Sequence, residues 1–230
     1  MSQRTKTVNQ RNKTMSKLLS ALAAGGLLTA AVVGVLVLGT TAPPVKAWAT
    51  LPPCDFLTGG GWIVYLGNKG TFGVGGGCKN GSGTNGIPYW GHLEYHDHGI
   101  GLNVHGTSIT DYIIFPDDGT NGTDPKTGQP IGTRYICGTA RTNLPSPNDN
   151  VNFIVRARDA GEPGVNDQFD IRVKNQFGAT VYDTTTECEF HYLGSYVPCA
   201  AGNGGGGNIQ LHKPNPSTTG VFNGGSCPAA

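Results

Sequence analysis

Residues 151–183 show the clearest pattern of apolar and polar positions in this chain. Apolar side chains at residues 151, 153, 155 and 157 alternate with mostly polar ones, which predicts a strand with one buried face. Residues 169–173 alternate in the same way. The connector between them, AGEPGVN at 160–166, is rich in residues that favour turns. We therefore predict a β-hairpin, followed by a further strand over residues 180–182.

Shorter stretches with strand-like patterns recur along the chain, and turn residues separate them. They cover residues 58–66, 71–74, 89–98, 102–115, 132–141 and 207–212. After residue 48 there is no sustained apolar period of 3.6 residues, so no long helix is expected. About nine short strands without a helical crossover predict an all-β fold, and favour an antiparallel β-sandwich over a single closed sheet.

Residues 89–107 make the most specific prediction of strand pairing. If Gly99 and Ile100 form the tip of a hairpin, Glu94 pairs with His105. His92, His96 and His98 then share the face of Glu94, whereas the apolar residues of both strands share the other face. This separation of polar from apolar side chains is the usual criterion for choosing a register.

The N-terminal part of the chain resembles an export signal. Residues 1–17 carry five basic residues and no acid, residues 18–38 are uncharged and apolar, and Val45-Lys46-Ala47 fits a cleavage site. We predict a signal peptide over residues 1–47 and a secreted or extracellular protein. The alternative is a retained membrane anchor, because 21 apolar residues are long enough to span a bilayer.

The expected mature chain has a lead-in at residues 48–57, a β-domain at 58–213 with a loop insertion at 184–206, and a flexible tail at 214–230. It contains 10 basic and 15 acidic residues, a net charge of −5. We therefore expect no nucleic-acid partner, and a membrane partner only if the N-terminal segment is retained. The expected partner is an extracellular ligand or an envelope component.

All six cysteines lie in the expected mature part. An even number of cysteines behind an export signal favours disulfides. The short spacing of Cys188 and Cys199 makes them the preferred pair. Tying the two ends together would then pair Cys54 with Cys227 and leave Cys78 with Cys137.

The predicted polar face offers a candidate zinc site, because imidazole and carboxylate groups suit zinc. Glu94 and His96 on one strand and His105 on the next are the expected ligands, and His98 could replace one of them. His92 and His96 lie about 13 Å apart along a strand, at ~3.3 Å per residue, which is too far to share an ion. A solvated polar sheet face is the competing interpretation.

The connector of the central hairpin offers a candidate calcium site. Asp159, Glu162, Asp167 and Asp170 supply the hard oxygen ligands that calcium prefers. The competing interpretation is that these acids only stabilise the turn. Zinc or calcium is thus the expected cofactor if the protein holds one, and the sequence assigns no catalytic residues.

Trp90 lies on the predicted polar face, where an aromatic ring could stack on a sugar. Aromatic residues in strands more often belong to the core. Trp90 is therefore a candidate ligand-binding residue for a carbohydrate-binding module.

Several segments in order resemble a family of bacterial exported β-domains, the post-COAP domains. They are TGGGW at 58–62, WGHLEYHDH at 90–98, DAGEPGVNDQFDIR at 159–172, VYD at 181–183 and GGNIQLH at 206–212. The resemblance covers residues 57–213 and implies an exported β-domain. It implies no activity or site residues, because none is assigned to that family.

The sequence thus favours a secreted or envelope-associated, non-catalytic β-domain with a structural or binding role. A zinc-dependent hydrolase that uses the His/Glu cluster is one alternative, and a carbohydrate-binding module is another.

Overall fold

The computed structural model describes residues 53–79, 89–114, 120–201 and 205–218, and residues 220, 222 and 227. The strands belong to one compact unit, Pro43–Ala230. They are β1 (Phe56–Tyr65), β2 (Asn68–Gly77), β3 (Trp90–Asp97), β4 (Leu102–Ile114), β5 (Gly122–Thr123), β6 (Pro130–Thr142), β7 (Asn150–Asp159), β8 (Gln168–Asn175), β9 (Thr180–Asp183) and β10 (Gly207–His212). One 3₁₀ turn, Thr184–Thr186, follows β9.

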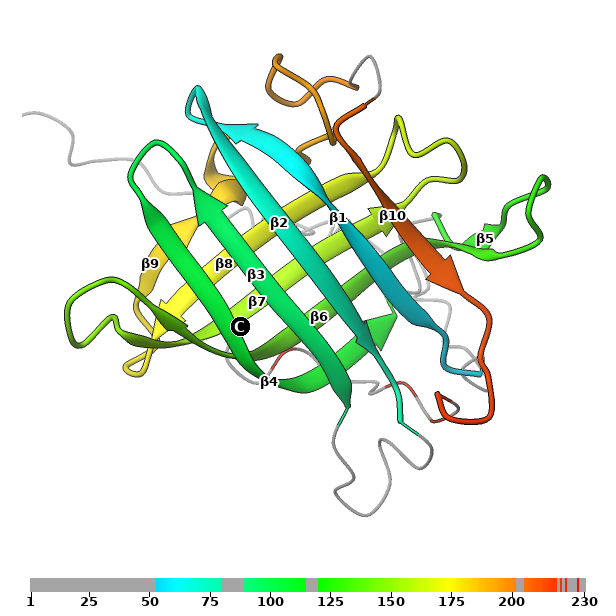
Figure 1. The fold of residues 1–230 in the computed structure, drawn as a ribbon, viewed down its shortest axis with the longest axis horizontal. Helices are drawn as coiled ribbons and strands as arrows, with labels where there is room; N and C mark the ends of the chain where they lie inside the picture. The colour runs from blue at the N-terminus through cyan, green and yellow to red at the C-terminus, as the bar shows by residue number, and fades with distance from the viewer. Residues whose placement is uncertain are drawn as a thin grey trace, which may run out of the picture. The chain divides into compact units, whose positions relative to one another are not determined.

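The all-β antiparallel fold predicted from the sequence is confirmed. The strands form one sheet with the order β10-β1-β2-β3-β4-β6-β7-β8-β9, and β5 pairs with β6. Figure 1 shows β10, β1, β2 and β3 lying across β6, β7, β8 and β9, so the sheet is folded over into a front and a back layer. β4 joins the layers, because it pairs with β3 on one side and with β6 on the other. The two layers therefore come from one sheet rather than from two separate ones.

The predicted central hairpin is β7 and β8, with Val155 paired to Ile171. Phe153, Val155, Phe169, Ile171 and their alternate neighbours point between the layers and are buried. The ring of Phe169 stacks on Phe72 of β2, with 3.7 Å between ring centroids. The alternation seen in the sequence thus marks the face on which the front layer packs.

The turn between β1 and β2 differs from the prediction. A turn was expected over residues 67–70, but Leu66 and Gly67 form it with φ values of 49° and 76°. Two positive φ values match the twist of a tight hairpin, so β2 begins at Asn68 and continues to Gly77. The polar loop expected over residues 116–130 also contains the short strand β5.

The six cysteines form three disulfides: Cys54–Cys78, Cys137–Cys227 and Cys188–Cys199. The predicted pair of Cys188 with Cys199 is confirmed. The predicted pairs Cys54–Cys227 and Cys78–Cys137 are wrong. The reason is strand register: Phe56 of β1 pairs with Gly77 of β2, which places the cysteines that flank these strands side by side.

The insertion at residues 184–206 connects the two layers. The backbone N–H of Phe169 in β8 donates to the carbonyl of His191 at 3.0 Å, and that of Gly194 donates to Trp62 of β1 at 3.0 Å. The insertion therefore closes one corner between the layers, where it is held by the Cys188–Cys199 disulfide.

Some expectations fall on residues outside the described part of the chain. They concern the signal peptide at 1–47, part of the lead-in at 48–57 and most of the tail at 214–230. In the part that is described, no helix is long and apolar enough to cross a membrane.

Candidate functional site

The outward side chains of β1, β2, β3, β4 and β10 form one exposed surface, here called the histidine face. Strand alternation builds it: Leu93 and Tyr95 of β3 are buried between the layers, so His92, Glu94 and His96 point outward. The other outward residues used below are Phe56, Thr58, Gly60, Trp62, Lys69, Thr71, Gly73, Gly75, Trp90, His98, Asn103, His105 and His212.

The predicted register between β3 and β4 is confirmed. Glu94 pairs with His105 and His96 with Asn103. The ladder ends at Glu94, and beyond His105 the strand β4 is paired only with β6. The same hairpin register would also pair His92 with Thr107, and this pair is not formed.

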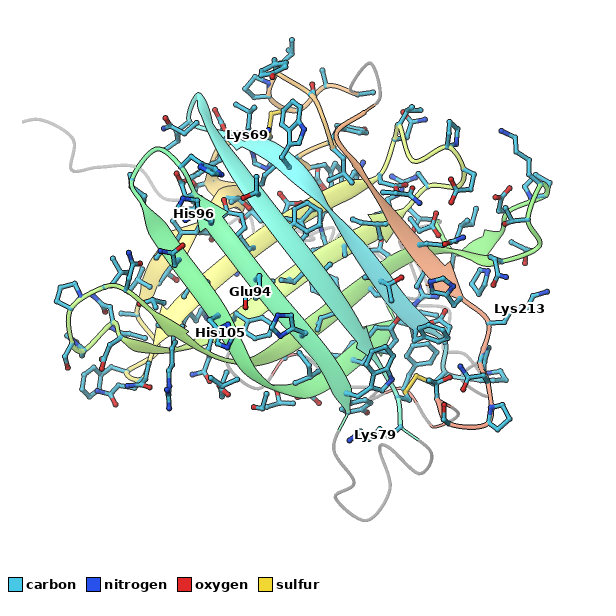
Figure 2. All side chains as sticks on the ribbon, viewed as in Figure 1. Lys69, Lys79, Glu94, His96, His105 and Lys213 are labelled. Atoms are coloured by element: carbon cyan, nitrogen blue, oxygen red, sulfur yellow. A yellow bond between two sulfur atoms is a disulfide. The ribbon has the colours of Figure 1, made fainter. Side chains whose placement is uncertain are left out.

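Glu94 is the centre of one polar cluster on the histidine face. Its Oε1 lies 3.2 Å from Nε2 of His92 and also contacts Nδ1 of His105. Figure 2 shows Glu94 and His105 close together on neighbouring strands, with His96 farther along β3. The three side chains are more than half exposed, so these contacts contribute little to stability.

His96 and His98 form a second cluster, separate from Glu94. Nδ1 of His96 contacts Oδ1 of Asn103, and Nε2 of His98 lies 3.1 Å from Oγ1 of Thr71. The two imidazole rings meet edge to face, 4.3 Å apart. Each imidazole ring thus has its own hydrogen-bond partner, Asn103 or Thr71, and lies apart from the carboxylate of Glu94.

The expected zinc ligands are therefore only partly brought together. Glu94 and His105 are in contact, but His92 rather than His96 is the third member of their cluster. Among the described residues, no three His, Cys, Asp or Glu side chains are arranged to share a metal ion. Zinc binding at this face stays a prediction, and the geometry adds no support to it.

Aromatic rings lie at both ends of the histidine face. At one end, the ring of Trp62 lies 4.8 Å from that of Tyr196 and 4.7 Å from the ammonium of Lys69. At the other end, Phe56 stacks on His212 and contacts Trp90. Trp90 does lie on the outer face, as predicted, but it is partly buried, and its ring is tilted against that of Phe56 with 5.8 Å between centroids. Trp62 and Tyr196 therefore form the better exposed platform.

A strip of exposed backbone without side chains separates the two aromatic ends of the face. It consists of Gly60, Gly73 and Gly75, and is here called the glycine lane. Gly60 of β1 pairs with Gly73 of β2, which pairs in turn with Glu94. Gly75 lies two residues along β2 on the same face. A Cβ built at Gly73 would have no atom within 4 Å, so nothing covers the backbone there. The sequence shows a run of three glycines at 59–61 and glycine at 73 and 75, but only the pairing of β1 with β2 shows that Gly60 and Gly73 are neighbours.

The predicted calcium ligands Asp159 and Asp167 hold β10 against the central hairpin. The carboxylate of Asp159 accepts the backbone N–H of Leu211 at 2.8 Å, and that of Asp167 accepts the N–H of Ile209 at 2.7 Å. Each also accepts an N–H within the connector. Burial raises the pKa of both carboxyls above the ordinary range, that of Asp167 to about 6.

The other two predicted calcium ligands have different surroundings. Asp170 is buried between Arg156 and His191, and Glu162 accepts the side-chain N–H of Asn208 at 3.2 Å. The four acids therefore do not converge on one point. Their hydrogen bonds and ion pairs within the protein account for their positions. Calcium binding stays a prediction.

Comparison with protein-family models, with curated proteins and with solved structures finds no match to this chain. The site must therefore be interpreted from its own geometry.

Proposed function

We propose that this protein is an exported, non-catalytic binding domain that holds a glycan chain on the histidine face. The glycine lane carries the proposal, because it leaves a flat path of backbone between two aromatic ends and two rows of hydrogen-bonding side chains. Three disulfides indicate an oxidising, extracellular environment, which supports export.

The chemistry of the face matches that of a sugar chain. Aromatic rings such as that of Trp62 offer an apolar surface for the C–H face of a sugar, with polar atoms at the edge. The imidazoles, Asn103 and Thr71 can donate to or accept from hydroxyl groups. A side chain at Gly60 or Gly73 would block the lane, so glycine there fits a ligand that lies across the strands.

The distribution of acids favours binding over hydrolysis. Most glycoside hydrolases use two carboxyl groups, about 5–9.5 Å apart. Glu94 is the one exposed acid among the described residues of β1, β2, β3, β4 and β10, because Asp97 and Asp111 are buried. It also contacts two imidazoles. We therefore expect retention of the glycan without turnover.

The test is retention of the protein, produced in an oxidising secretory compartment, on a panel of immobilised polysaccharides. Trp62→Ala should weaken retention by removing the platform. Gly73→Thr should abolish it by filling the lane. Because no atom lies near a Cβ at position 73, this variant should keep its fold and gain about 0.5–1 kcal/mol.

Lys174→Gln changes a half-exposed residue of β8, in the other layer, and is the matched control, which should bind as the wild type does. Retention should also survive dialysis against EDTA. Undiminished retention of Gly73→Thr, or retention by no polysaccharide, would overturn the proposal. Loss with EDTA together with loss in His105→Ala would instead support the zinc hypothesis.

A further inference from the structure

A cavity of about 340 Å³ opens between β9 and two turns of the front layer. The turns are the β1–β2 turn, with Leu66, and the β3–β4 turn, with Ile100; both lie at the β9 end of the layers in Figure 1. All four residues of β9 line the cavity. Its volume is in the range of sites for small ligands.

Two apolar side chains at the cavity rim are exposed to solvent. Leu66 is 64% exposed and Ile100 is 67% exposed. Leu66 also has a φ of 49°, in the left-handed region that disfavours a bulky residue. An exposed leucine in this conformation has two unfavourable features for stability, which points to a role in contacting something else.

A carboxylate lies at the inner end of the cavity. Oδ2 of Asp97 accepts the hydroxyl of Tyr182 at 2.6 Å, and Oδ1 accepts the backbone N–H of Gly99 at 2.7 Å. These donors are neutral, as is the N–H of Ile100, which lies 3.2 Å from Oδ1. The negative charge of Asp97, which is almost fully buried, therefore has only neutral hydrogen-bond partners among the contacts described.

The remaining lining fits a cation. Tyr65 and Tyr182 present aromatic rings, which attract cations, and Asp183 adds a second carboxylate, already paired with Arg172. None of the described residues that line the cavity is basic.

We propose that this cavity binds a small primary alkylammonium ion. Its alkyl chain would lie between Leu66 and Ile100, and its ammonium group would face the tyrosine rings and Asp97. This site is distinct from the histidine face and does not depend on the glycan proposal.

The test compares butylammonium, 1-butanol and butyrate, which share the alkyl chain and differ in charge. Calorimetric titration of the whole protein at constant ionic strength should give the tightest binding for butylammonium. We expect about tenfold weaker binding for 1-butanol, and none for butyrate. Equal affinity for butylammonium and 1-butanol, or no binding of butylammonium, would overturn the proposal.

Rim variants locate the site. Leu66→Gly and Ile100→Ser should each weaken butylammonium binding at least about fivefold, and Leu66→Gly should not lower the melting temperature, because glycine tolerates the positive φ. Phe177→Ser is the control. Phe177 is 75% exposed and lies in another turn outside the cavity, so this variant should bind butylammonium with wild-type affinity. Wild-type affinity in both rim variants would place the ligand elsewhere and overturn the assignment.

Discussion

Arg134 and Asp55 form an ion pair inside the protein, 79 residues apart in the chain. Nε of Arg134 donates to Oδ1 of Asp55 at 3.0 Å, and both side chains are almost fully buried. The hydroxyl of Tyr112 donates to the same oxygen at 2.9 Å. The pair joins the residue before β1 to β6, and so connects the two layers.

Replacing Asp55 by Ala should therefore be strongly destabilising. It would leave the guanidinium of Arg134 buried without its anion, which costs roughly 3–5 kcal/mol. Glu94→Ala is the control: it removes an exposed acid, and should change stability by less than about 1 kcal/mol. Urea unfolding measures both. A loss in Asp55→Ala no greater than that of the control would contradict the buried pair.

The disulfides should differ in their contribution to stability. The Cys137–Cys227 bond closes 90 residues of chain, whereas Cys188–Cys199 closes 11. A cross-link restricts the unfolded chain more when its loop is longer. Replacing Cys137 and Cys227 by Ala should therefore lower the free energy of unfolding by about 4–5 kcal/mol, and replacing Cys188 and Cys199 by less than about 3 kcal/mol. Urea unfolding compares them, and the reverse order would contradict this account.

Peptide mapping without reduction tests the pairing itself. The expected result is one linked fragment for each of the three bonds. A fragment that joins Cys54 to Cys227, the pair expected from the sequence, would contradict the structure.

Asp167 should make stability depend on pH in the acid range. Burial raises the pKa of its carboxyl from 3.8 to about 6. Between about pH 4 and 6 the folded protein keeps a proton that the unfolded chain releases, so stability should fall as pH rises. Asp167→Asn cannot ionise, and its unfolding free energy should fall less steeply over that window. Equal slopes of unfolding free energy against pH in the wild type and in Asp167→Asn would contradict this role of Asp167.

His191 should make stability depend on pH in a higher range than Asp167 does. Burial alone would lower its pKa, but hydrogen bonds and charges from Asp170, 2.7 Å away, and from Glu187 raise it above the ordinary value. The protonated form therefore adds stability that is fully present below about pH 6.5 and is lost as pH rises through the folded pKa. His191→Gln should lack this loss in unfolding experiments from pH 6 to 9. An equal loss in both proteins would assign it to another group.

Local patterns in the sequence were enough to predict the described strands except the short β5. The alternation in β7 and β8, and the segregation of polar from apolar residues in β3 and β4, gave the right faces and the register of Glu94 with His105. The physical reason is that a strand with one buried face must alternate, so burial is recorded in neighbouring residues. The sequence also indicated the all-β class and the Cys188–Cys199 bond, since both depend on features close together in the chain.

Contacts between distant segments were decided only by the tertiary structure. Nothing local shows that Asp55 meets Arg134, or that Asp159 and Asp167 bind the backbone of β10 rather than an ion. The pairing of Cys54 with Cys78 follows from the hairpin register of β1 and β2. These contacts arise because one sheet folds over at β4 and brings its two halves together, and the side chains that meet there depend on the packing of the whole chain.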